Sequence, residues 1–180
     1  MQKTITYFLV VAIIVLGALL LILNNNSEPQ NDSATPEISY KDIEYIIDGQ
    51  PVILANGVSE VEAAPGSASK IVTRYFGNNA NGDLNGDNIP DIGFILTQET
   101  GGSGTFYYVA VALKTETGYR GTNAILLGDR IAPQTTKIKN GGIIVNYADR
   151  KEDEPMTAQP SVGVSRYFQI NGDELIEINI

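Results

Sequence analysis

Short β-rich runs separated by Asx-Gly turns constrain the fold of this chain more than any other feature. The stretch "IEYIIDGQPVILANG" (residues 43–57) places two apolar runs around Asp48-Gly49, a dipeptide that favours a two-residue hairpin. Similar runs continue toward the C-terminus, with further turns expected at residues 140–142 and at Asn171-Gly172. The pattern predicts a mainly β protein with a single antiparallel β-rich domain over residues 41–180.

One of these runs, "TFYYVAVAL" (residues 105–113), has apolar side chains on both faces. Side chains alternate across a strand, so one face would carry Phe106, Tyr108, Ala110 and Ala112, and the other Tyr107, Val109 and Val111. A strand that is apolar on both faces is covered on both sides. This run is therefore predicted to be a central strand.

The segment "SASKIVTRYFG" (residues 67–77) admits two interpretations. Apolar residues spaced i, i+4 would suit a short helix near residues 67–76. Its β-branched run and its aromatic residues suit a strand. We prefer the strand and keep the helix as the alternative.

The N-terminal run from Ile5 to Leu23 is uncharged and has no polar face. As a helix it would span roughly 28 Å, close to the bilayer core of about 30 Å. It predicts a transmembrane anchor at residues 5–23 after a tip at residues 1–4; a cleaved signal peptide is the alternative, but no Ala-x-Ala site follows. Lys3 precedes the run and acids follow it, which favours a cytoplasmic N-terminus and a periplasmic or extracellular domain. Residues 24–40 are polar and predict a disordered linker.

Composition excludes several classes of function. The chain has no histidine or cysteine, so it cannot build a Ser-His-Asp triad, a cysteine nucleophile or a Cys/His zinc site. Its net charge of −9 argues against nucleic-acid binding, which needs a basic surface. Carboxylate pairs, Ser–Lys dyads and oxygen-ligated metals remain.

The loop "DLNGDNIPD" (residues 83–91) is the strongest candidate site. It places side-chain oxygens at Asp83, Asn85, Asp87 and Asp91, and the backbone carbonyl of Ile89 completes the alternate-residue spacing. A tightly coiled loop with this spacing points its oxygens at one cation, and three carboxylates with an amide suit Ca²⁺ better than Mg²⁺. These five residues are the predicted ligands of a structural Ca²⁺.

Two positions define the limits of this motif. Asn88 stands where such loops usually carry glycine, and asparagine is a residue that tolerates positive φ. Phe94 stands where an EF-hand has its bidentate glutamate, so the loop is not an EF-hand. The alternative is a metal-free turn in which Asn-Gly pairs and Asp side chains shape the connection.

The loop and the strand after it, roughly residues 79–112, resemble one calcium-loop unit of FG-GAP/VCBS-type repeats. This resemblance implies that the four matching side chains ligate Ca²⁺. The whole domain also resembles an uncharacterised family of small membrane-anchored or exported bacterial proteins, through "GGSGTFYYV", "LLGDRIAPQTT", "NYADR" and "EPMTAQPSVG". That second resemblance implies no chemistry.

Other sequence features point to chemistry less specifically. Ser67 and Lys70 match S-x-x-K, but the companion motifs of penicillin-recognising enzymes are absent, so we interpret the match as chance. Residues 146–160 form a long polar loop, interpreted as a solvated tip, with a recognition loop as the alternative.

The sequence therefore predicts a membrane-anchored extracytoplasmic binding or structural module, not an enzyme. It would contact the membrane through residues 5–23 and an envelope or cell-surface partner through its domain. The alternative is an anchored hydrolase that cleaves envelope glycans with a pair of carboxylates.

Overall fold

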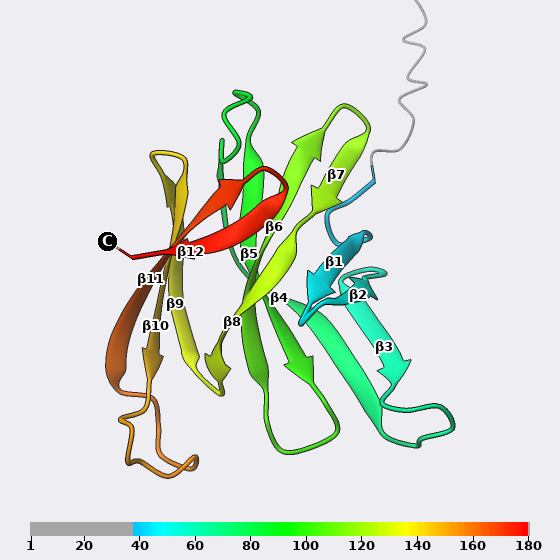
Figure 1. Cartoon of the computed structure of the whole chain (residues 1–180). Helices are drawn as coiled ribbons and strands as arrows, with labels where there is room; N and C mark the ends of the chain where they lie inside the picture. Colours follow the sequence, from blue (N-terminus) through cyan, green and yellow to red (C-terminus); the bar gives the residue numbers. More distant parts are fainter. Residues whose placement is uncertain (1–37, 180) are drawn as a thin grey trace, which may run out of the picture. The chain divides into compact units, whose positions relative to one another are not determined.

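The structure, a computed structural model, describes residues 38–179, and these residues are all β (Figure 1). The predicted tip, anchor and most of the predicted linker lie outside the described residues. Within residues 38–179 there is no helix long and apolar enough to cross a membrane. The strands are β1 (Glu44–Ile47), β2 (Gln50–Ile53), β3 (Val58–Glu62), β4 (Lys70–Gly82), β5 (Asp91–Glu99), β6 (Phe106–Thr115), β7 (Gly118–Gly121), β8 (Asn123–Asp129), β9 (Ala132–Lys139), β10 (Gly142–Asp149), β11 (Val162–Asn171) and β12 (Glu174–Ile178).

Eight strands form a nearly closed, barrel-like sheet in the order β2-β1-β8-β6-β5-β4-β3, with β7 paired to β6. The expectation of a purely antiparallel domain is wrong at one pair, because β1 runs parallel to β8, with Ile46 opposite Asn123 and Ile47 opposite Ala124. A two-residue turn forces its strands to be antiparallel, whereas a long connection leaves the direction free. Between β1 and β8 the chain passes through six other strands.

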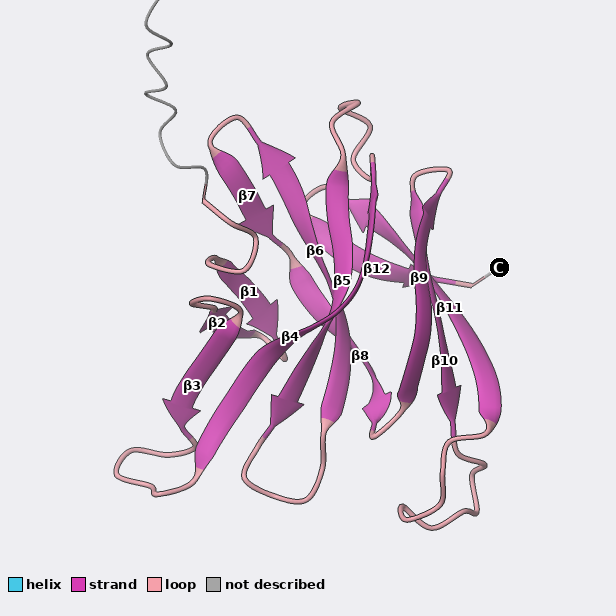
Figure 2. Cartoon of the chain, turned by 180° about the vertical axis from the view of Figure 1, so that it is seen from behind, coloured by secondary structure: helices cyan, strands magenta, loops and turns pink. Residues whose placement is uncertain are grey.

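The remaining strands form a four-stranded antiparallel sheet in the order β12-β11-β10-β9 (Figure 2). The predicted turn between β9 and β10 is confirmed, since Asn140 and Gly141 both have positive φ (52° and 71°). Asp48 and Gly49, between β1 and β2, also have positive φ (51° and 77°), as a type I′ hairpin requires.

Strand β6 lies between two hydrophobic cores, which confirms the prediction of a central strand covered on both sides. Tyr108, Ala110 and Ala112 belong to a core on the inner face of the barrel-like sheet. Val109, Val111 and Leu113 belong to a second core, which residues of the four-stranded sheet complete from the other side. The alternation of β6 therefore decides which residues serve each core.

Two boundaries needed the tertiary structure. The strand interpretation of the 67–77 segment is confirmed by β4, and the alternative helix is wrong, because pairing with β3 and β5 on both sides satisfies the backbone of β4. The sequence predicts a linker over residues 24–40, yet the centroid of the Tyr40 ring lies 5.6 Å from that of Phe94 and 5.8 Å from that of Tyr75. Packing of the domain thus begins before residue 41.

Candidate functional site

The predicted metal loop connects β4 to β5, where Gly82 lies opposite Asp91 in the antiparallel ladder. Asp83 organises its first half. One carboxylate oxygen accepts the Gly86 amide at 2.7 Å, and the other accepts the Asn88 amide at 3.0 Å. These two bonds coil the chain around the Asp83 side chain.

Asn85 and Asp87 continue this pattern. Asn85 Oδ1 accepts the Asp87 amide at 3.0 Å, and Asp87 Oδ1 accepts the Ile89 amide at 2.7 Å. Asn85 Nδ2 also donates to Asp87 Oδ2 at 3.0 Å. Three alternate side chains thus bend back onto the backbone of their own loop, as Asx turns do.

The backbone at the centre of the loop is left-handed. Gly86 has φ of 83° and Asn88 has φ of 66°. Positive φ at Asn88 confirms the conformation expected from its position in the motif. Among residues other than glycine, asparagine is one of the few whose backbone readily adopts positive φ.

Asp91 is placed differently from the other predicted ligands, because its side chain is fully buried. Its Oδ2 accepts the Leu84 amide and its Oδ1 accepts the Lys114 amide, both at 2.9 Å. Burial raises the pKa of the Asp91 carboxyl, the two amide bonds oppose that shift, and the nearby charges of Asp87 and Asp83 add to it. Asp91 therefore ties the start of the loop to the end of β6.

The donor set fits a hard cation in kind. Asp83, Asn85 and Asp87 offer carboxylate and amide oxygens on the exposed side of the loop, and each oxygen has a second lone pair beyond its amide bond. However, no three Asp or Glu side chains within residues 38–179 are gathered closely enough to hold a metal ion. Asp91 is directed inward instead. The calcium site thus remains a prediction.

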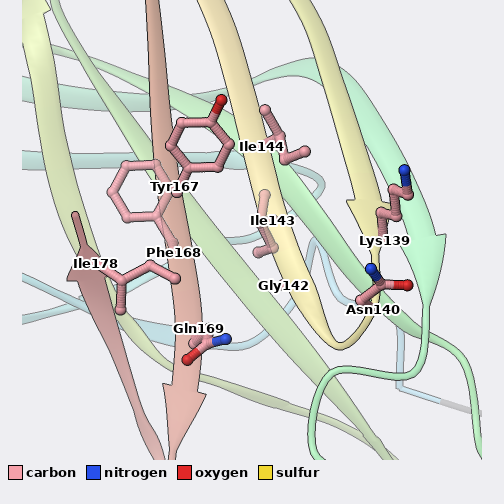
Figure 3. Close-up of a pocket in the computed structure, with 9 residues that line it drawn as sticks. All are labelled: Lys139, Asn140, Gly142, Ile143, Ile144, Tyr167, Phe168, Gln169 and Ile178. Carbon is pink, nitrogen blue, oxygen red and sulfur yellow. The ribbon is translucent and has the colours of Figure 1, made fainter. Parts of the chain in front are cut away.

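A hollow of about 210 Å³ lies beside the β9–β10 turn in the four-stranded sheet (Figure 3). Gly142 contributes no side chain there. The lining residues are Lys139, Asn140, Gly142, Ile143, Ile144, Tyr167, Phe168, Gln169 and Ile178. None of them is acidic, so this hollow does not offer the carboxylate pair of a glycan hydrolase.

A second hollow of about 330 Å³ lies among β2, β3 and β4. Its single acidic residue, Glu60, is paired with Lys70. Two carboxylates in one cleft are the minimum for glycoside hydrolysis. This hollow therefore gives the hydrolase alternative no support either.

The same ion pair bears on the S-x-x-K match. The Lys70 ammonium pairs with Glu60, whereas Ser67 Oγ accepts a hydrogen bond from the Ser69 amide at 3.1 Å. Ser67 and Lys70 thus bond to different partners, which is what a chance match to the motif predicts.

Sequence reasoning missed the role of Arg150 in the long loop after β10. Its Nε donates to the Ala158 carbonyl at 2.7 Å, and its guanidinium also donates to the Arg130 carbonyl at 3.0 Å. Residues 151–153 are exposed, in keeping with a solvated tip. The hydrogen bond to the distant Arg130 carbonyl identifies Arg150 as an anchor, and no local pattern in the sequence marks it.

No protein-family model, curated protein or solved structure matched this chain. The likeness to FG-GAP/VCBS units accordingly rests on the residues of the loop and its strand.

Proposed function

We propose that this chain is a membrane-anchored, extracytoplasmic binding or structural module in which Ca²⁺ fastens loop 83–91. The observation that carries the proposal is the coil of side-chain to backbone bonds made by Asp83, Asn85 and Asp87. That coil gathers hard oxygen donors on one short exposed segment. The apolar run at residues 5–23 supports the anchor.

Asp83, Asn85 and Asp87 would hold the ion with their side chains, and Ile89 would add its carbonyl oxygen. The ion would neutralise acidic groups that otherwise repel one another. Asp91, buried beneath the loop, would act mainly through the Leu84 and Lys114 amides. Since a ligand that binds only the folded state adds its binding free energy to folding, the role of Ca²⁺ would be structural.

Thermal unfolding of the full chain in nonionic detergent, with Ca²⁺ or with a chelator, tests the metal. At one hundred times the dissociation constant, Ca²⁺ adds about 2.7 kcal/mol. That corresponds to a rise in Tm of roughly 5–10 °C for a chain of this size. Asp87→Asn keeps the acceptor for the Ile89 amide but removes charge, and it should abolish most of the rise.

Asp153→Asn is the matched control, because Asp153 is an exposed acid in another loop. It should respond to Ca²⁺ as the wild type does. Equal melting temperatures with Ca²⁺ and chelator for the wild type, together with a flat calorimetric titration, would refute the calcium proposal. Resistance to alkaline carbonate extraction, and its loss when residues 1–23 are deleted, tests the anchor separately.

A further inference from the structure

The barrel-like sheet does not close, and its two free edges are β2 and β3. The turn Asn56-Gly57 joins these strands, and Figures 1 and 2 both show them side by side. At the turn, Ala55 and Val58 exchange two backbone hydrogen bonds of 2.8 and 3.1 Å. Beyond that single bridge, β2 and β3 are not paired. We call the gap between them the seam.

The bridge determines which backbone groups point into the seam. In an antiparallel ladder, successive residues direct their N–H and C=O to opposite sides. Val58 directs its groups to Ala55, so Glu60 directs its own toward the same side, away from β4. The Leu54 amide donates to the Ile43 carbonyl on the β1 side, so the neighbouring Ile53 also faces the seam.

Pro51 opposes continued pairing of the two strands. A continued hairpin would pair Ile53 with Glu60, and then Pro51 with Glu62. Pro51 has no N–H, so the second pair would lack a donor. Proline also marks edge strands, where its nitrogen faces outward.

Apolar side chains at the seam are exposed. Val61 is 54% exposed, and it lies opposite Ile71 on the face that continues toward the inner core. Ile53 of β2 lies on the opposite, outer face of the sheet and is 64% exposed. The seam includes the hollow of about 330 Å³ described above. A further strand in the seam would cover Val61 and Ile71, as the neighbouring strand does in a closed barrel.

The outer face of the seam is acidic. Glu44 lies opposite Ile53, and both Glu60 and Glu62 project from β3 on the side opposite to Val61. Lys70 pairs with Glu60. Glu44 and Glu62 form no ion pair with any residue in the described part of the chain. An incoming strand that carries basic side chains on this face would complement them.

We infer that the seam between β2 and β3 binds an extended polypeptide strand with apolar side chains on its inner face and basic side chains on its outer face. The strand would add to the sheet by main-chain hydrogen bonds to Ile53 and Glu60, the mode called β-augmentation. Exposed edges with apolar side chains are common sites of such pairing. This inference rests on the proposed binding role and is independent of Ca²⁺.

The test uses the full chain, labelled with ¹⁵N, in nonionic detergent. The probe is a blocked heptapeptide of alternating lysine and valine, Lys-Val-Lys-Val-Lys-Val-Lys. A peptide of the same composition with its lysines and valines in separate blocks is the control. The alternating peptide should shift the amide signals of Ile53, Glu60 and their neighbours and slow the hydrogen exchange of those two amides, and the block peptide should not.

Val61→Asp should weaken binding of the alternating peptide at least tenfold. Val162→Asp, at a comparably exposed valine on β11, should leave it unchanged. Chelation of Ca²⁺ should not alter peptide binding, so the two proposals can fail separately. Absence of shifts at the seam, equal binding of both peptides, or equal effects of the two substitutions would overturn the inference. So would concentration-dependent dimers in sedimentation that Val61→Asp abolishes, because the occupant would then be a second copy of the chain.

Discussion

Replacing Asp91 by alanine should destabilise the domain more than the same replacement at Asp83, Asn85 or Asp87. The substitution leaves the Leu84 and Lys114 amides without their acceptor beneath the loop. A buried donor without a partner costs about 1–3 kcal/mol. Two such donors give a loss of about 2–6 kcal/mol. Part of this loss is offset, because the variant no longer buries a carboxylate, and burial disfavours the charged form and raises its pKa.

This loss is a large share of the roughly 5–15 kcal/mol that stabilises a typical domain. With a urea m-value of about 2 kcal/mol/M, a loss of 3 kcal/mol lowers the midpoint by about 1.5 M. The assay is equilibrium urea unfolding of the full chain with a chelator present, so that Ca²⁺ contributes nothing. Asp91→Asn keeps one acceptor oxygen and should fall between wild type and Asp91→Ala.

Asp87→Ala is the matched control within the same loop. Asp87 is exposed, and its carboxylate accepts bonds from the Ile89 amide and from Asn85. Water replaces exposed partners, so the expected loss in chelator is about 1 kcal/mol or less. If Asp91→Ala lay within about 0.5 kcal/mol of wild type, or cost less than Asp87→Ala, the assignment of Asp91 as the buried tie would be wrong.

Three further predictions follow from the packing, the tyrosines and the long loop. A Cβ on Gly82 would lie 2.6 Å from Ile138 Cγ2, so Gly82→Val should cost about 1–3 kcal/mol in urea unfolding, and Ile138→Ala should recover part of that loss. Burial, aided by the nearby Asp48 carboxylate, raises the pKa of Tyr108 to about 12; because the unfolded tyrosine titrates near 10, stability should be retained below pH 10 and fall as pH rises from about 10 to 12. Tyr108→Phe should flatten that fall, and an unchanged pH profile would contradict the assignment. Arg150→Ala removes the anchor of the long loop and should accelerate its cleavage in limited proteolysis, whereas Lys151→Ala at its exposed tip should not.

Local rules in the sequence were sufficient to predict the turns and the central strand. Asp48-Gly49 and the turn at residue 140 require positive φ, a preference carried by those residues themselves. The two apolar faces of β6 follow from the period of a strand. The positions of Asp83, Asn85 and Asp87 also follow from a local pattern, because their alternate spacing places them on one short coil.

Pairings between distant segments were decided only by the tertiary structure. Nothing local in β1 indicates that it runs parallel to β8, and nothing in β4 alone excludes a helix, because the outcome depends on which edges are available to satisfy the backbone. The spacing that placed Asp91 among the metal ligands could not reveal that its side chain turns inward to distant amides.

The seam illustrates the same division. Pro51 and the valines of β3 are visible in the sequence, but no local pattern places them at the two free edges of one sheet. The strand order, which runs from β2 through β1, β8, β6, β5 and β4 to β3, makes β2 and β3 the two free edges of the sheet. Propensity acts over a few residues, whereas strand order is set by contacts across the whole domain, and the exposed edges that follow from it belong to the tertiary structure alone.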